Sequence, residues 1–219
     1  MRTVLFDMDG ILINSEPFWC AAELNVFSHH GLELTAKQTE ETIGLRIDEV
    51  VEHWRAKGHE LRGETTEIAQ AIVEEVARLV RAGGEALPGV HETMTMLQQR
   101  GARIGLATSS SPPLIAAVLE RLAIADCFEV TVSAEFEEYG KPHPAVYLTA
   151  ASKMNVAPTR CLAIEDSVNG VLSAKSARMR VLAIPEKQLS GDPRFGIADR
   201  VSTSLTELSA ADWDALLSQ

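Results

Sequence analysis

A chain of 219 residues, 46% hydrophobic and 23% charged, has enough apolar material for a sizeable core, which excludes disorder as its main state. Its 31 acidic residues outnumber its 20 Lys and Arg and give a formal net charge of −11. This surplus argues against a nucleic-acid or anionic-membrane partner, because both need clustered positive charge. It still allows a small anionic ligand, since the local field at a site matters more than the total charge.

Cysteine usage and the N-terminus indicate the compartment. Cys20, Cys127 and Cys161 are widely spaced and form neither a CxxC pair nor a Cys/His cluster, so we expect no disulfide framework and no zinc site. No apolar run approaches the roughly 20 residues of a membrane span. The first apolar run meets Asp7 at once, which is a poor signal peptide. We expect a soluble cytoplasmic protein.

Short apolar runs recur along the chain and are separated by segments with helical periodicity. Each run is too short for a helix, so we predict buried strands at 3–6, 103–108, 129–133, 161–164 and 181–184. Strands that alternate with helices form βαβ units. The predicted fold class is therefore α/β, with a Rossmann-like, doubly wound parallel sheet as its core.

The stretch 15–83 differs because it contains no convincing strand. Ser15 suits a helix N-cap, Pro17 suits the first turn, and apolar residues from Ile68 to Val80 form a stripe at helical spacing before Gly83. We predict an inserted α-helical cap domain at 15–83 and a core domain formed by 1–14 and 84–219.

Asp7 and Asp9 follow the first predicted strand in the sequence Asp-Met-Asp-Gly. In an extended chain, residues i and i+2 point to the same side, so both carboxylates face one point just beyond the strand. That arrangement suits a hard cation with oxygen ligands, or a nucleophile beside an acid/base group. The alternative is a simple turn, because Asp and Gly are common turn residues.

Three further polar segments also fall at ends of predicted strands. Thr108 begins a hydroxyl-rich stretch ahead of Pro112, which suits either an anion site at a helix start or a plain cap. Lys141, in a proline-rich loop, can neutralise an anion or simply be solvated. Glu165 and Asp166 can complete a cation site or cap a helix. Ligands of open α/β sheets bind at the carboxyl ends of the strands, so these segments should converge.

The order of these segments resembles the haloacid dehalogenase-like superfamily of phosphoryl-transfer enzymes. Residues 6–10 match its first motif, Thr108 its second, Lys141 its third and Glu165–Asp166 its fourth. The resemblance covers essentially the whole chain, including a helical cap between the first and second motifs. Finer features look most like bacterial phosphatases for 2-deoxyglucose 6-phosphate and hexitol phosphates, in the β-phosphoglucomutase-like branch; these features are 7–19, 44–48 and 165–170.

The resemblance implies a mechanism. Asp7 is the expected nucleophile, forming an aspartyl-phosphate, and the Asp9 side chain is the expected acid/base group for the leaving alcohol and the attacking water. Mg²⁺ is the expected cofactor, held by the carboxylates of Asp7 and Asp166 and by the backbone carbonyl of Asp9. Glu165 is expected beside this metal site, where it orients water or pairs with Lys141.

The resemblance also implies the groups that bind substrate. Thr108, the backbone N–H of Ser109 and Lys141 are expected to bind the phosphoryl oxygens. Arg46, in the cap segment 44–46, is a candidate contact to a sugar or phosphate oxygen; the alternative is an arginine on a helix surface. The expected partner is a small phosphorylated sugar or sugar alcohol, and the expected oligomeric state is a monomer.

Two positions, Asp9 and Trp19, bear on which reaction of this superfamily the chain catalyses. The dehalogenase branch lacks the second acid of the first motif, so Asp9 favours phosphoryl transfer. Mutases of this branch keep a His where this chain has Trp19, and Trp cannot act as an acid or base, so hydrolysis is favoured over a phosphosugar mutase.

Asn14 stands where many relatives have Asp, and we expect a hinge role for it. A non-catalytic phosphate-binding protein on this fold is the alternative from another class, and the intact motif set argues against it.

Overall fold

The computed structural model describes residues 3–42 and 45–218, which fall into two compact units. The sheet unit consists of Met1–Asn14, Glu85–Pro112 and Leu122–Gln219. The helical unit consists of Ser15–Gly84 and Pro113–Arg121. None of the helices in the described part of the chain is long and apolar enough to cross a membrane.

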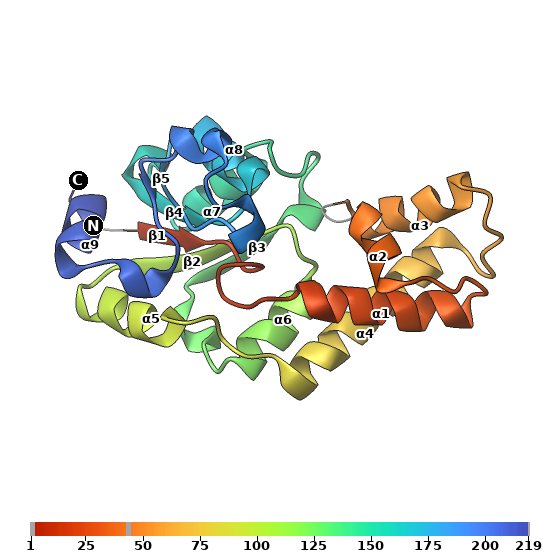
Figure 1. Ribbon diagram of the computed structural model, residues 1–219. Helices are drawn as coiled ribbons and strands as arrows, with labels where there is room; N and C mark the ends of the chain where they lie inside the picture. Colours follow the sequence, from red (N-terminus) through yellow and green to blue (C-terminus); the bar gives the residue numbers. More distant parts are fainter. Residues whose placement is uncertain (1–2, 43–44, 219) are drawn as a thin grey trace. The chain divides into compact units, whose positions relative to one another are not determined.

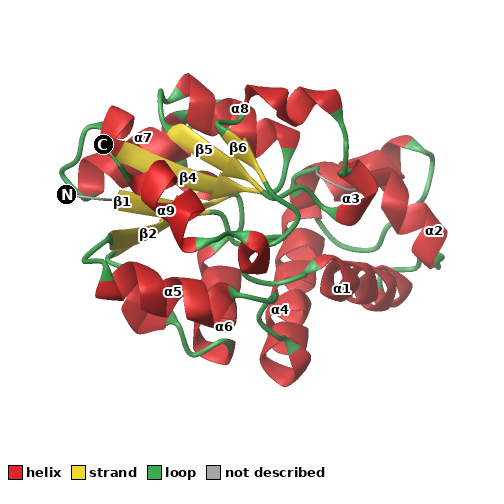
Figure 2. Ribbon diagram, turned by 60° about the vertical axis from the view of Figure 1, so that its left-hand side comes forward, coloured by secondary structure: helices red, strands yellow, loops and turns green. Residues whose placement is uncertain are grey.

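Parallel strands form the centre of the sheet unit (Figure 2). The sheet has six strands in the order β3-β2-β1-β4-β5-β6. Their bounds are β1 Thr3–Phe6, β2 Arg103–Thr108, β3 Val130–Ser133, β4 Cys161–Glu165, β5 Arg180–Ala183 and β6 Arg200–Val201. The five predicted strands are confirmed with small shifts at their ends. Strand β6 was not predicted, because its two residues are exposed and do not form an apolar run.

The register of the strands brings distant segments to one edge. Phe6 at the end of β1 lies opposite Leu106 of β2 and Ile164 of β4, so these three central strands end within about two residues of one another. All four residues of β1 are buried, because the strand is central and covered on both faces. The chain leaves β1 at the point where the strand order reverses, which is where open α/β sheets bind ligands.

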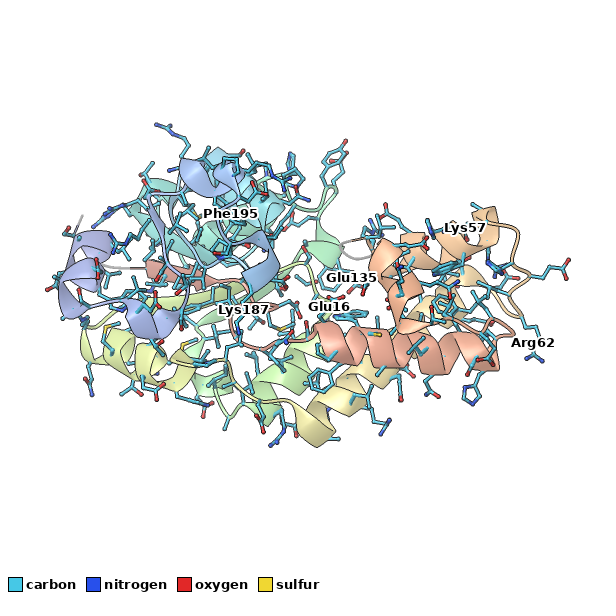
Figure 3. The ribbon with its side chains drawn as sticks, viewed as in Figure 1. Glu16, Lys57, Arg62, Glu135, Lys187 and Phe195 are labelled. Atoms are coloured by element: carbon cyan, nitrogen blue, oxygen red, sulfur yellow. The ribbon has the colours of Figure 1, made fainter. Side chains whose placement is uncertain are left out.

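Helices cover both faces of the sheet. In Figures 1 and 2, α7 (Ala145–Lys153) and α8 (Val168–Ser176) lie on one face and α5 (Val90–Gln99) lies on the other. The helix α9 (Ala210–Leu217) lies near the C-terminus. The side of the sheet that carries α7 and α8 has a continuous apolar core, which includes Phe195 (labelled in Figure 3). The α/β prediction is therefore confirmed.

The helical unit contains α1 (Glu16–His29), α2 (Ala36–Thr39), α3 (Ile47–Ala56), α4 (Thr65–Gly83) and most of α6 (Pro112–Arg121). The predicted stripe on α4 is buried, and both α1 and α3 pack against this helix. Trp54 of α3 is 1% exposed and belongs to the core of this unit. Ser15 occupies the predicted N-cap of α1, but its side chain makes no capping hydrogen bond.

The two units differ from the predicted domains in one helix. The prediction assigned 84–219 to the core, whereas residues 113–121 of α6 group with the helical unit. An ion pair between Arg81 of α4 and Glu120 of α6 accompanies this grouping. The boundaries of independently folding domains stay a prediction.

Candidate active site

The site begins where β1 ends. Asp7 follows β1 directly, is 7% exposed, and donates its N–H to the carbonyl of Ile164 at 3.0 Å. The chain then turns sharply at Gly10, whose φ of +74° suits glycine. A Cβ atom at Gly10 would overlap the carboxyl group of Asp166, so this glycine lets the turn approach the end of β4 closely.

Lys141 is the central cation of the site. Its ammonium group donates to Asp7 Oδ1 at 2.8 Å, to Glu165 Oε1 at 2.5 Å and to the carbonyl of Ala107 at 3.1 Å. The side chain is 7% exposed, and these acceptors use all three N–H donors of a lysine. The alternative of a solvated loop lysine is therefore excluded. Burial alone would lower the pKa of Lys141, but the neighbouring carboxylates of Asp7 and Glu165 outweigh it and raise this pKa.

Glu165 is completely buried at the end of β4 and has both oxygens engaged. Oε1 accepts from Lys141 and, at 2.6 Å, from the hydroxyl of Tyr147. Oε2 accepts from the Asp166 N–H and the Ser167 hydroxyl at longer distances. Glu165 is therefore an anchor for Lys141, which is one of the two arrangements that the sequence predicted for it.

Tyr147 also contacts this cluster, although no sequence motif pointed to it. It packs in the core of the sheet unit with 0% exposure. A buried tyrosine hydroxyl needs a hydrogen-bond partner, so a Tyr at a core position was the available signal. The partner is Glu165, and burial, reinforced by this carboxylate, raises the pKa of Tyr147 well above its usual value.

Three carboxyl groups gather beside this lysine. Asp7, Glu165 and Asp166 each offer an oxygen atom, and these atoms lie within 4.8 Å of one another. Burial raises the pKa of Asp7 to about 7, with Glu165 and Asp9 contributing and Lys141 opposing. Burial, followed by the charges of Asp7 and Glu165, raises the pKa of Asp166 to about 9. One buried lysine therefore does not balance these acids, and a hard divalent cation with oxygen ligands fits the set.

The loop after β2 forms the other side of the site. Thr108 ends this strand and is 1% exposed, and its Oγ1 accepts from the Ser110 N–H at 3.1 Å. Ser109 is exposed. The Ser110 hydroxyl donates to Asp9 Oδ2 at 2.6 Å, which ties this loop to the turn after β1. The structure thus brings together Asp7, Asp9, Thr108, Lys141, Glu165 and Asp166, as the sequence predicted.

Two other predicted residues, Arg46 and Trp19, belong to the helical unit. Arg46 belongs to the helical unit, where it precedes α3 and pairs with Asp48, and its side chain is 74% exposed. Gly44, in the same predicted segment, lies outside the described residues. Trp19 is half-buried on α1, and Asn14 is exposed at the end of the first segment of the sheet unit. The proposed substrate contact of Arg46 stays a prediction.

Known proteins resemble this chain along nearly its whole length. The profile of the haloacid dehalogenase-like hydrolases matches residues 1–178. The chain is 41% identical to hexitol phosphatase B from Escherichia coli strain K12 over 209 residues, which are 95% of this chain and 94% of that protein. It is 28% identical to β-phosphoglucomutase from Bacillus subtilis, over 98% of this chain and 96% of that enzyme.

A solved structure agrees with the fold. The crystal structure of CbbY from Rhodobacter sphaeroides in complex with phosphate matches with a TM-score of 0.88 and 24% identity, over 98% of this chain and 99% of that one. Together with the converging motifs, these similarities confirm the predicted family. The chain belongs to the haloacid dehalogenase-like hydrolases, in their β-phosphoglucomutase-like branch, and it is a phosphatase.

Proposed function

We propose that this enzyme is a Mg²⁺-dependent phosphatase that hydrolyses small sugar phosphates through an aspartyl-phosphate. The substrates that we propose are hexose and hexitol phosphates, including 2-deoxyglucose 6-phosphate. The observation that carries the proposal is the buried Asp7 carboxylate, held by Lys141 beside Asp166 with Asp9 two residues away. The 41% identity to a hexitol phosphatase supports the substrate class.

In this proposal Asp7 attacks the phosphorus atom. A carboxylate is a competent nucleophile for phosphoryl groups, but it must be ionised and must approach another anion. Lys141 supplies one positive charge to Asp7 Oδ1. Mg²⁺ would be held by the carboxylates of Asp7 and Asp166 and by the Asp9 carbonyl, and it would supply the positive charge that this acidic cluster lacks.

Asp9 supplies the proton transfers. As the bond from Asp7 to phosphorus forms and the bond to the leaving oxygen breaks, the Asp9 carboxyl group donates its proton to that oxygen. In the second step a water oxygen attacks phosphorus, its proton passes to Asp9, and the bond from phosphorus to Asp7 breaks. Asp9 thus returns to its protonated state, and inorganic phosphate leaves.

The groups around the nucleophile stabilise the transferred phosphoryl group. We assign this role to Thr108, to the backbone N–H of Ser109 and to Lys141, which act where charge spreads over the phosphoryl oxygens. Glu165 keeps Lys141 in place. We also propose that residues 15–83 act as a cap that admits only small phosphomonoesters, with Arg46 contacting the sugar or its phosphate. We also propose that the enzyme is a monomer located in the cytoplasm.

The test compares the wild-type protein with Asp7→Asn on hexitol and hexose phosphates and on p-nitrophenyl phosphate, with Mg²⁺ and with a chelator. We expect hydrolysis by the wild type, loss of it with the chelator, recovery with Mg²⁺, and no turnover by the variant. If Asp7→Asn retained turnover, Asp7 would not be the nucleophile.

β-Glucose 1-phosphate separates hydrolysis from isomerisation. The relative at 28% identity is a mutase, whereas this chain carries Trp19 where mutases of the branch are expected to keep a His. We expect free phosphate as the product. An isomerised phosphosugar would show that the enzyme is a mutase instead.

A further inference from the structure

Ser110 connects two loops of the active site through its side chain. It lies between β2 and α6, and its hydroxyl donates to Asp9 Oδ2 at 2.6 Å across 101 residues of sequence. The distance is that of a strong hydroxyl–carboxylate hydrogen bond. The sequence pointed to the hydroxyl-rich stretch that contains Ser110, but it gave Ser110 itself no role.

The backbone of Ser110 is held independently of this hydrogen bond. Its N–H donates to Thr108 Oγ1 at 3.1 Å, and its carbonyl accepts from the hydroxyl of Ser133 at 2.7 Å. Ser133 is 5% exposed at the end of β3, and its hydroxyl also accepts from the N–H of Glu135, which is labelled in Figure 3. Two neighbouring strands therefore fix the position of Ser110, and its hydroxyl is not needed to hold the loop.

We propose that Ser110 is a positioning residue for Asp9, a role that rests on the proposed function of Asp9 as the acid/base group. The hydrogen bond restricts the rotamer of the Asp9 side chain and aligns its carboxyl group for proton transfer.

The proposal predicts an effect that depends on the leaving group. A sugar or sugar alcohol leaves as an unstable alkoxide unless it receives a proton, whereas p-nitrophenolate is stable without one. General acid catalysis contributes about 10²–10⁴-fold when it is needed, and a misaligned acid loses part of that. Release of a sugar alcohol in the first turnover should therefore depend on Ser110, while first-turnover release of p-nitrophenolate should not.

Ser110→Ala tests the proposal in rapid-mixing experiments with the full-length protein and Mg²⁺. We expect first-turnover release of the alcohol from a hexitol phosphate to fall about 10–100-fold, and the p-nitrophenolate burst to stay within about threefold of wild type. Ser110→Thr keeps a hydroxyl and should recover most of the loss. Ser218→Ala is the control, because the exposed Ser218 hydroxyl donates to the carbonyl of Ala215 near the C-terminus, and it should leave both rates unchanged.

A double-mutant cycle with Asp9→Asn shows whether Ser110 acts through Asp9. If it does, Asp9→Asn/Ser110→Ala should be no slower in alcohol release than Asp9→Asn alone. Equal losses with both substrates, or additive losses in the double variant, would overturn the positioning role. A wild-type protein inactive on hexitol phosphates, or an active Asp7→Asn variant, would instead overturn the proposed function, so the two failures are distinguishable.

Discussion

Two lysines, one in each unit, have the same kinds of partner and opposite surroundings. Lys141 pairs with Glu165 and lies 5.1 Å from the ring centroid of Tyr147, and its side chain is 7% exposed. Lys57 in the helical unit pairs with Glu41, lies 4.9 Å from the ring centroid of Trp54, and is 42% exposed. Figure 3 labels Lys57.

Burial decides what each set of contacts can do. Solvent screens the pair of Lys57, which resembles the surface ion pairs that contribute little to stability. Lys141, Asp7 and Glu165 are all nearly buried, so the charge of Lys141 acts strongly on both acids, and those acids depend on it. The same residue types therefore form an exposed ion pair in one unit and part of the proposed reaction site in the other.

The largest expected difference comes from removing each lysine. Lys141→Met leaves Asp7 and Glu165 buried without their cation, so we expect activity to fall about 10²–10³-fold and the free energy of unfolding to fall by about 3–5 kcal/mol. Lys57→Met should leave activity unchanged and stability within about 0.5 kcal/mol. Phosphate-release assays and urea unfolding measure both. If the two variants lost similar amounts of activity and stability, burial would not explain the difference between the two lysines.

Two glycines extend the comparison. A Cβ atom at Gly170 of α8 would overlap the Glu165 carboxyl group, so Gly170→Ala should lower the unfolding free energy by about 2 kcal/mol and reduce activity by displacing Glu165 from Lys141. Gly83, at the end of α4 in the helical unit, has nothing within 4 Å of such an atom. Gly83→Ala should be neutral or stabilising by up to about 1 kcal/mol. If Gly170→Ala were destabilised but fully active, Gly170 would be needed for packing and not for the position of Glu165.

Glu23 is the exception in the helical unit, because it is buried and no cation among the described residues forms an ion pair with it. It is 7% exposed, and its Oε2 has no hydrogen-bond partner among the described residues. Burial, reinforced by the charge of Glu16, raises the pKa of Glu23 from 4.5 to about 7. A raised pKa means that the folded state favours the protonated form, so this contribution to stability is present below pH 4.5 and is lost as the pH rises through 7.

Glu23→Gln should remove the loss of folding stability that ionisation of Glu23 causes at high pH. We expect the variant to be more stable than wild type by an amount on the order of 2 kcal/mol at pH 8, and the difference to shrink towards pH 5. Thermal unfolding across this pH range measures it. Glu75→Gln is the control, because Glu75 pairs with Arg78 at the surface and has a lowered pKa. A constant difference across the pH range would show that Glu23 is ionised in the folded state.

The smallest expected effect concerns the hydroxyl of Tyr147. Tyr147→Phe removes one hydrogen bond to Glu165, while Lys141 still donates to the same oxygen, so we expect a loss of about 1 kcal/mol in stability and a modest loss of activity. Tyr139→Phe, at an exposed position, should change neither. An effect on activity as large as that of Lys141→Met would show that Tyr147 does more than hold Glu165.

Sequence patterns located most of the site because its chemistry lies directly after buried strands. Asp7 follows β1, Thr108 ends β2, and Glu165 ends β4. The apolar runs therefore indicated the strands, and the polar residues at the ends of these runs indicated the site. Strand β6 was not predicted, because two exposed residues are too few to show an alternation of apolar and polar side chains. The grouping of α6 with the helical unit also escaped it, since a helical pattern does not show which neighbours a helix contacts.

The sequence by itself determined the parallel α/β fold, the helical insertion, the family and the acids and lysine that carry the proposed chemistry, because these follow from local periodicity and from motifs at strand ends. Only the tertiary structure decided which groups support them. Tyr147 holds Glu165, Ser110 holds Asp9, and Gly170 leaves room for a carboxyl group. Each of these roles depends on a distance between side chains from different elements, and such distances exist only once the chain is folded.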